Sequence, residues 1–322
     1  MDKDKLFVSS YAPYWHNGSS LSVKSYNIML AALPAVILGI TQYGAPALGV
    51  VAFSVSFAIF WELIMNYVMK RPVTIGDGNA ALIGLLFAML LPANTPWWVV
   101  LVGTFIAIVI GKQIFGGMGC NPLNPPLVAI AMLMLSWEAM LSFDEALVNY
   151  DLGFYMAYPL AALKHSGPDI LYHYSPGQLL MGQQVGAIGT TFGLGLIIGG
   201  IYLILRGFIR WEITLSFLTG VFVTSLLFYV SDPAAYAPPY FHLLTGYTLI
   251  GAFFLAPEDA SSPVHFIPML IYGACAGFLT VLIRNIGAFA DGVVFAVLLV
   301  NVANPLFDKI RPKALGKGTD HA

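Results

Sequence analysis

Residues 47–69 read Ala-Leu-Gly-Val-Val-Ala-Phe-Ser-Val-Ser-Phe-Ala-Ile-Phe-Trp-Glu-Leu-Ile-Met-Asn-Tyr-Val-Met, and the only charged side chain among them is that of Glu62. A helix needs roughly 20 mostly apolar residues to cross the hydrocarbon core of a membrane. We therefore expect this stretch to cross a membrane as a helix.

The composition of the whole chain agrees with this expectation. Of its 322 residues, 58% are hydrophobic and 9% are charged, whereas a soluble domain carries about 25% charged residues. This excludes a cytosolic enzyme and a disordered protein, and the net charge of −2 provides no basic field for a nucleic acid. The two isolated cysteines, Cys120 and Cys275, form neither a metal motif nor a disulfide framework. The remaining class is an all-α membrane protein that crosses the bilayer several times.

Ten apolar stretches are candidates for transmembrane helices. They are residues 26–43, 47–69, 79–91, 97–115, 125–141, 185–205, 213–230, 242–255, 266–283 and 292–306. With the N-terminus inside, 12 of the 14 basic residues fall in inner segments, and only Lys164 and Arg284 fall outside. The positive-inside rule predicts this bias, so we expect both termini to be cytoplasmic.

Residues 81–92 and 248–257 resemble each other, because each is a short apolar stretch that ends in proline. Five spans in each half would give the halves opposite orientations, and inverted repeats place functional sites at their interface. The expected organisation is an N-terminal segment (1–25), a first five-helix repeat (26–141), an extracytoplasmic loop (142–184), a second repeat (185–306) and a cytoplasmic tail (307–322). A chance likeness between apolar runs is the alternative.

Three carboxylates fall where lipid is expected, namely Asp77, Asp291 and Glu62. Ionisable residues inside a membrane are unfavourable and usually mark an ion path or a ligand, so these three are our candidates for an ion path. Helix capping is the alternative for Asp77 and Asp291. For Glu62, the alternative is an acid that snorkels to the nearby membrane surface.

Two glycine-rich segments are candidate binding sites. Residues 115–126 contain three glycines and three prolines and cannot continue a helix. The side chains of Asn121 and Asn124 there could bind a flavin, a cation or each other, and we interpret Cys120 as a buried small hydrophobe. Residues 186–193 supply Gly186, Gly189, Thr190 and Thr191 at the expected start of the sixth span. A helix N-terminus favours an anion such as phosphate, and small-residue packing is the alternative.

Several of these motifs resemble those of the RnfD/NqrB family. The clearest are Lys70-Arg-Pro-Val-Thr-Ile-Gly-Asp-Gly-Asn-Ala-Ala81 and Gly111-Lys-Gln-Ile-Phe-Gly-Gly-Met-Gly-Cys-Asn-Pro-Leu-Asn-Pro125, and residues 9–13, 271–284 and 290–301 also match. Members of this family are membrane subunits of ion-pumping redox complexes that link ferredoxin or NADH to NAD or quinone. The length of the chain favours the RnfD branch.

The resemblance implies a flavin, which in this family is FMN bound to a threonine through a phosphoester. In this sequence Tyr158 occupies the threonine position, and a phenol is not an equivalent acceptor. Flavin could be absent, FMN could bind without a covalent bond beside Tyr158, or attachment could have moved to Thr190 or Thr191. We favour loss of the covalent bond. Riboflavin, which NqrB relatives contain, is a further candidate.

The resemblance therefore predicts the RnfD-like membrane subunit of an Rnf-type complex, which couples electron transfer between ferredoxin and NAD to the translocation of Na⁺ or H⁺. Its expected partners are membrane, flavin and iron–sulfur subunits in the inner membrane of a bacterium. We expect no complete active site and no metal site in this chain alone. The alternatives are a stand-alone transporter or channel, and a structural subunit without a redox role.

Overall fold

The computed structural model describes residues 20–146 and 150–310, and within these ranges the chain is helical without a strand. The remaining parts of the predicted terminal segments, including the motif at 9–13, lie outside the described residues. The helices are α1 (Leu21–Tyr43), α2 (Ala45–Val68), η1 (Ile75–Asp77), α3 (Asn79–Met89), α4 (Trp97–Phe105), η2 (Ile106–Gln113), α5 (Pro125–Ser136), η3 (Glu138–Leu141), α6 (Phe143–Ala146), α7 (Pro159–Ser166), η4 (Pro168–His173), α8 (Pro176–Leu180), α9 (Gly193–Leu205), α10 (Trp211–Ser231), α11 (Pro239–Leu244), α12 (Thr248–Ile250), η5 (Gly251–Leu255), α13 (Phe266–Ile286) and α14 (Val293–Phe307).

Four of the described helices, α1, α2, α10 and α13, are long and apolar enough to cross a membrane. The shorter apolar helices are α3, α4 with its continuation η2, α5, α9 and α14. Large apolar side chains are exposed on the long helices, for example Leu227 and Val230 on α10, and such surfaces suit contact with lipid. The chain is therefore a helical membrane protein with several crossings.

Two predicted spans differ from the structure. Residues 185–192 are not helical, and α9 begins only at Gly193. The backbone N–H of Gly189 instead donates to the carbonyl of Met89, at the end of α3. The N–H of Ile188 donates to the carbonyl of Leu91, just beyond that helix. Residues 242–255 are divided among α11, α12 and η5, with Gly246 at φ +66° between the first two.

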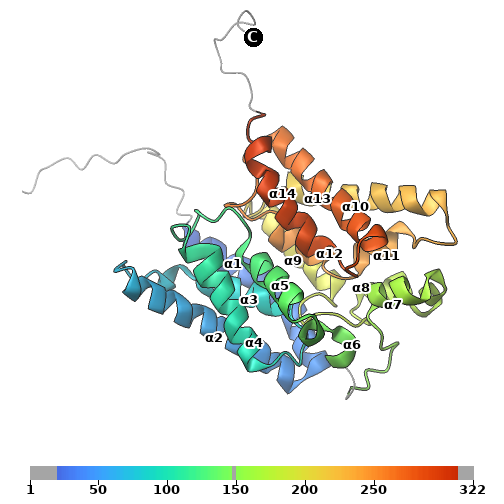
Figure 1. Cartoon of the computed structure of the whole chain (residues 1–322), viewed down its shortest axis with the longest axis horizontal. Coiled ribbons are helices and arrows are strands. Elements are labelled where there is room, and N and C mark those ends of the chain that lie inside the picture. Colours follow the sequence, from blue (N-terminus) through green and yellow to red (C-terminus); the bar gives the residue numbers. More distant parts are fainter. Residues whose placement is uncertain (1–19, 147–149, 311–322) are drawn as a thin grey trace, which may run out of the picture.

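The helices form two groups that meet through close contacts (Figure 1). The blue-to-green helices α1–α5 lie on one side, and the gold-to-red helices α10–α14 lie on the other. Helix α1 packs on α9, and α5 packs on α14. At the first contact, a Cβ atom added to Gly199 would lie 2.1 Å from the carbonyl oxygen of Ala31. Glycine at this position therefore allows α1 and α9 to approach closely.

The predicted extracytoplasmic loop contains the short helices α6, α7, η4 and α8. It packs on the helical body, since the hydroxyl of Tyr150 donates to the carbonyl of Tyr43 at 2.9 Å. From this loop Tyr158 enters the protein interior, where it is 5% exposed. The loop therefore contributes to the core as well as covering it.

Candidate functional site

Helix α5 runs between two cavities, one at its start and one near its end. Pro125 and Pro126, at its start, line a cavity that also contains Glu258. Met134, near its other end, lines a cavity that contains Tyr158. We refer to these as the Glu258 cavity and the Tyr158 cavity. The parts of the molecule around them are called the Glu258 end and the Tyr158 end.

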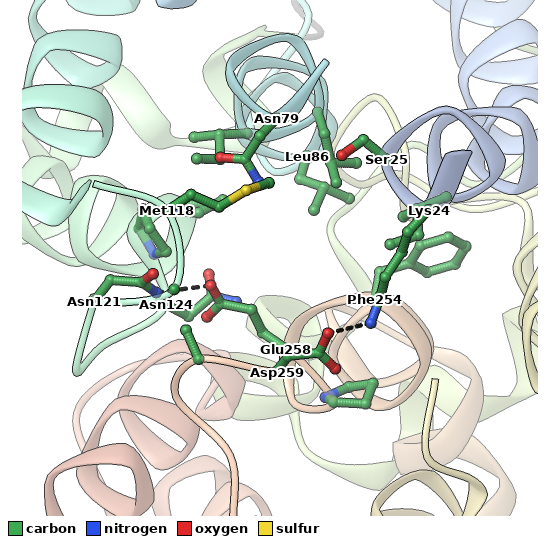
Figure 2. A pocket seen from close by; sticks show the side chains of 18 of the residues that line it. Lys24, Ser25, Asn79, Leu86, Met118, Asn121, Asn124, Phe254, Glu258 and Asp259 are labelled. Carbon is green, nitrogen blue, oxygen red and sulfur yellow. Dashed lines mark hydrogen bonds and ion pairs between the residues drawn. The ribbon is translucent and has the colours of Figure 1, made fainter. Parts of the chain in front are cut away.

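The Glu258 cavity lies between the two groups of helices and has an empty volume of about 970 Å³ including its open mouth. Figure 2 shows Leu86 and Phe254 among its apolar side chains, with Asn121 and Glu258 on the polar side. The amide of Asn121 donates to Oε1 of Glu258 at 2.7 Å. An apolar cavity with a few convergent polar groups is the usual form of a site for a small organic ligand.

The local backbone explains why the asparagines face this cavity. Gly116, Gly117 and Gly119 all have positive φ, a conformation that favours glycine, so the chain turns before α5 begins. Asn124 then caps α5 by accepting from the N–H of Leu127, while its amide donates to the carbonyl of Leu255 at 3.0 Å. The prediction of non-helical structure here is confirmed, and the asparagine links the two groups of helices.

Cys120, in the same segment, is exposed. The interpretation of this residue as a buried hydrophobe is therefore wrong. Its neighbours Gly119 and Asn121 line the Glu258 cavity, and the turn points the thiol away from the packed interior.

Glu258 follows η5 in the chain, and its half-buried side chain lines the cavity. Burial raises the pKa of this carboxyl to about 7, although the hydrogen bonds from Ser261 and Asn121 act in the opposite direction. Lys24 and Asp259 form an ion pair nearby (Figure 2). The charge of Glu258 can therefore change near neutral pH.

Glu62 is fully buried and pairs with a lysine from a different helix. The ammonium of Lys112, in η2, lies 2.9 Å from both carboxylate oxygens of Glu62, and it is 2% exposed. The hydroxyl of Thr74 donates to Oε1 of Glu62 at 2.7 Å. Glu62 therefore does not snorkel to the surface, because its partner satisfies the charge inside the protein.

Asp77 lies at the same end of the molecule as Glu62. Its Oδ1 accepts from the N–H of Asn79, the first residue of α3, at 2.8 Å. The N-cap residue of α3 is Gly78, so Asp77 lies one residue before the cap and binds across it. Asp77 and Glu62 also line one cavity, which we name the Glu62 cavity.

Asp291 pairs with Arg284 at the Tyr158 end. Nη2 and Nε of Arg284 lie 2.9 Å and 3.2 Å from Oδ1 of Asp291, and both residues are buried. The same oxygen accepts from the N–H of Val293, which fixes the start of α14, and Oδ2 accepts from the N–H of Tyr247 at 2.6 Å. Asp291 therefore pairs its charge with Arg284 and also binds the first N–H of α14 across Gly292, which is the N-cap residue.

Tyr158 lies beside this pair. Its hydroxyl donates to Oδ2 of Asp291 across 3.4 Å, and its ring centre lies 4.6 Å from that of Phe143. The Tyr158 cavity has an empty volume of about 1140 Å³ including its open side, and Tyr247 and Phe289 add aromatic surface to it. The structure thus brings Tyr158 and Asp291, which are far apart in the sequence, into one site.

The second glycine-rich segment takes a different form from the one expected. Thr190 and Thr191 are buried, and their hydroxyls donate to the carbonyl of Ala187 and to Oε1 of Gln42. Gly186 donates its N–H to the hydroxyl of Tyr43, and a Cβ atom at Gly189 would lie 2.4 Å from Met89. Helix α9 begins only at Gly193, the last residue of this segment, so these four residues precede the helix instead of forming its first turn.

Sequence reasoning missed three residues of these sites: Lys112, Arg284 and Glu258. The first two were counted as loop charges, but both are buried inside helices. A signal was present, because a single cation in an otherwise apolar helix needs a buried acid as its partner. For Glu258, the signal was a carboxylate directly after an apolar stretch that ends in proline.

Comparisons with known proteins identify the family of this chain. The model of the NQR2, RnfD, RnfE family matches residues 8–316. The chain belongs to this family. It is 34% identical over 314 residues to the D subunit of a proton-translocating ferredoxin:NAD(+) oxidoreductase complex from Clostridium ljungdahlii, covering 95% of each chain.

Two further relatives have similar coverage. The D subunit of a Na(+)-translocating ferredoxin:NAD(+) oxidoreductase complex from Acetobacterium woodii is 35% identical over 313 residues, covering 96% of this chain and 94% of the relative. The D subunit of an ion-translocating oxidoreductase complex from Pectobacterium carotovorum is 32% identical over 350 residues, covering 96% and 99%. The relatives named for H⁺ and for Na⁺ are thus about equally similar to this family member.

Proposed function

We propose that this chain is the RnfD subunit of an Rnf-type complex that couples electron transfer between ferredoxin and NAD to the movement of Na⁺ or H⁺ across a membrane. The observation that carries the proposal is the full-length match to relatives named as the corresponding subunit of such complexes. Two buried ion pairs inside an apolar helical body support the ion-translocating part, because buried charges in a membrane usually serve ion movement.

The proposed architecture is ten crossings arranged as two inverted repeats of five. It is supported by the packing of first helix on first helix (α1 on α9) and of fifth on fifth (α5 on α14). The fourth helix of each half also carries a buried cation near its end, Lys112 in η2 and Arg284 in α13. These cations line different cavities, and an inverted repeat would place them on opposite sides of the membrane.

The proposed ion path runs between these ends. Glu62 and Asp77 lie at the Glu258 end, which we assign to the cytoplasmic side with both termini. Asp291 lies at the opposite, external side. Helix α3 connects the two groups of charges. It begins beside Asp77, and the carbonyl of Leu90, directly after its end, accepts from the hydroxyl of Tyr247, whose N–H donates to Asp291. Short helices of this kind border the sites of many transporters.

The proposed cofactor is a flavin held without a covalent bond, FMN or riboflavin. Such a group would supply electron transfer in this subunit. The Glu258 cavity fits a flat amphipathic ring, because Leu86 and Phe254 provide apolar walls and Asn121 and Glu258 provide hydrogen bonds. The aromatic side chains of the Tyr158 cavity provide a second surface on which a ring could stack.

Thr190 and Thr191 are poor acceptors for a covalent flavin, because their hydroxyls are buried and already bonded. The proposed partners are the membrane, flavin and iron–sulfur subunits of the complex. The proposed location is the inner membrane of a bacterium.

Purification of the chain from its native membrane in mild detergent tests this function. We expect iron–sulfur and flavin subunits to co-purify, and the isolated subunit to release free flavin on denaturation. A homogeneous homo-oligomer without redox cofactors would instead support a stand-alone transporter. Co-purifying redox subunits together with a flavin-free chain would support a structural subunit.

In-gel fluorescence after denaturation in SDS tests the type of flavin attachment. We expect no fluorescent band at the mass of this subunit. A fluorescent band would overturn the proposal that the covalent bond is lost.

A further inference from the structure

Two ion pairs are buried in the part of the chain that the structure describes, and they are held very differently. At Asp291, backbone N–H groups of Tyr247 and Val293 and the hydroxyl of Tyr158 all donate to the carboxylate. Arg284 also donates to the carbonyl of His242. Breaking this pair would disrupt several backbone contacts at once, and the planar fork of arginine fits such a fixed arrangement.

The pair of Glu62 and Lys112 has fewer restraints. In the described structure, Glu62 accepts hydrogen bonds only from the side chains of Lys112 and Thr74. The ammonium of lysine is a compact charge on a flexible stem. Lys112 can therefore withdraw from Glu62 without breaking any backbone hydrogen bond of the carboxylate.

Space for such a movement lies beside the pair. The Glu62 cavity has an empty volume of about 450 Å³ including its open side, and Lys112, Thr74 and Asp77 are among the residues that line it. Thr74 is exposed as a residue, and its hydroxyl, which also accepts from the amide of Asn66 at 3.1 Å, is part-buried where it bonds to Glu62. Asp77 offers a second carboxylate toward which the ammonium can move.

Charge balance then restricts what can happen at Glu62. Removing one partner of a buried ion pair is strongly unfavourable, because the other charge remains uncompensated. When the ammonium leaves, another cation has to take its place. The carboxylate of Glu62 and the hydroxyl of Thr74 provide oxygen ligands suited to a small hard cation.

We propose that Lys112 is a tethered cation that occupies a monovalent-cation site formed by Glu62 and Thr74. A translocated cation enters this site only as the ammonium moves into the Glu62 cavity. The inference rests on the proposed role in ion translocation. It assigns to Lys112 the task of keeping the site closed until it is displaced.

Sodium binding to the purified complex tests the proposal without any electron transfer. We would measure binding of radioactive sodium at constant ionic strength, with choline as the replacing cation. In Lys112→Met the tether is removed, and we expect the apparent Kd for sodium to fall at least about tenfold relative to the wild type, equivalent to about 1.4 kcal/mol. Lys70→Met is the matched control, because Lys70 is exposed at the same end of the molecule.

A double variant, Glu62→Gln with Lys112→Met, removes both charges and should lose the tight sodium binding. Equal sodium affinity in Lys112→Met and the wild type, or equal tightening in the single and double variants, would overturn the proposal. If Lys112→Met does not assemble, its assembly is compared in sodium and choline media. Rescue by sodium supports the tether, whereas failure in both media together with assembly of the double variant overturns it.

Ferredoxin-dependent reduction of NAD by the wild-type complex tests the proposed function separately. If the wild-type complex does not catalyse that reaction, the redox role is contradicted, and the sodium-binding result can still be interpreted. Normal NAD reduction with unchanged sodium affinity in Lys112→Met would contradict only the tether.

Discussion

The guanidinium of Arg284 donates two hydrogen bonds to Oδ1 of Asp291, at 2.9 Å and 3.2 Å, and so joins the end of α13 to the start of α14. Both side chains are buried, so neither charge is compensated by water. The carboxylate also orders the backbone at Tyr247 and the hydroxyl of Tyr158. This pair therefore connects α13, α14, the start of α12 and the loop before α7.

Removing one partner of this pair should destabilise the protein strongly. We expect Arg284→Met to lower the free energy of unfolding by about 3–5 kcal/mol, because Asp291 is left charged and buried. The measurement is thermal unfolding of the purified complex. The double variant Arg284→Met with Asp291→Asn serves as the control and should recover part of the lost stability. If the double variant loses more free energy of unfolding than the two single variants lose when their losses are added, this account is contradicted.

Two substitutions at Asp77 separate its hydrogen bond to the backbone from its charge. Asparagine still accepts a hydrogen bond from the N–H of Asn79, so the free energy of unfolding of Asp77→Asn should lie within about 0.5 kcal/mol of the wild-type value. Asp77→Ala loses this hydrogen bond, and its free energy of unfolding should be lower by about 1 kcal/mol. Ion translocation in proteoliposomes should fall in both variants, and unchanged ion-coupled turnover in Asp77→Asn would remove Asp77 from the path.

Glu258 should make stability depend on pH. Its pKa is raised to about 7 in the folded protein from an ordinary value of 4.5, so between these values the folded state holds a proton that the unfolded state has lost. This contribution to stability is complete below pH 4.5 and is lost as the pH rises to about 7. The loss is on the order of 1 kcal/mol per pKa unit, reduced by any solvent in the cavity.

Glu258→Gln removes this titration. Relative to the wild type, the variant should therefore gain thermal stability as the pH rises from about 5 to about 7.5. Asp169→Asn is a control, because that carboxylate is exposed and does not shift the pKa of Glu258. A constant difference between Glu258→Gln and the wild type across this pH range would show that Glu258 does not titrate there.

The crossing of α1 and α9 should not tolerate a side chain at Gly199. A Cβ atom there would lie 2.1 Å from the carbonyl oxygen of Ala31, so Gly199→Ala should destabilise the protein by about 1–3 kcal/mol. Gly49→Ala is the matched control, since no atom lies within 4 Å of its added Cβ. Thermal unfolding measures both, and equal stability of the two variants would contradict the close packing.

The sequence by itself determined the class of the protein and its family. Long apolar stretches such as 47–69 can be stable only in lipid or in a dry interior, and the segment 111–125 carries enough glycine, asparagine and proline to be recognised. Its break in helical structure was also predictable, because proline and glycine act on the local backbone.

Only the tertiary structure decided which charges belong together. Lys112 and Glu62 are 50 residues apart, and they meet because α2 packs against η2. In an apolar interior a charge must find its partner wherever packing places one, and helix packing is not encoded in local sequence. For the same reason Tyr158 and Asp291 were predicted separately, and only the fold brings them together.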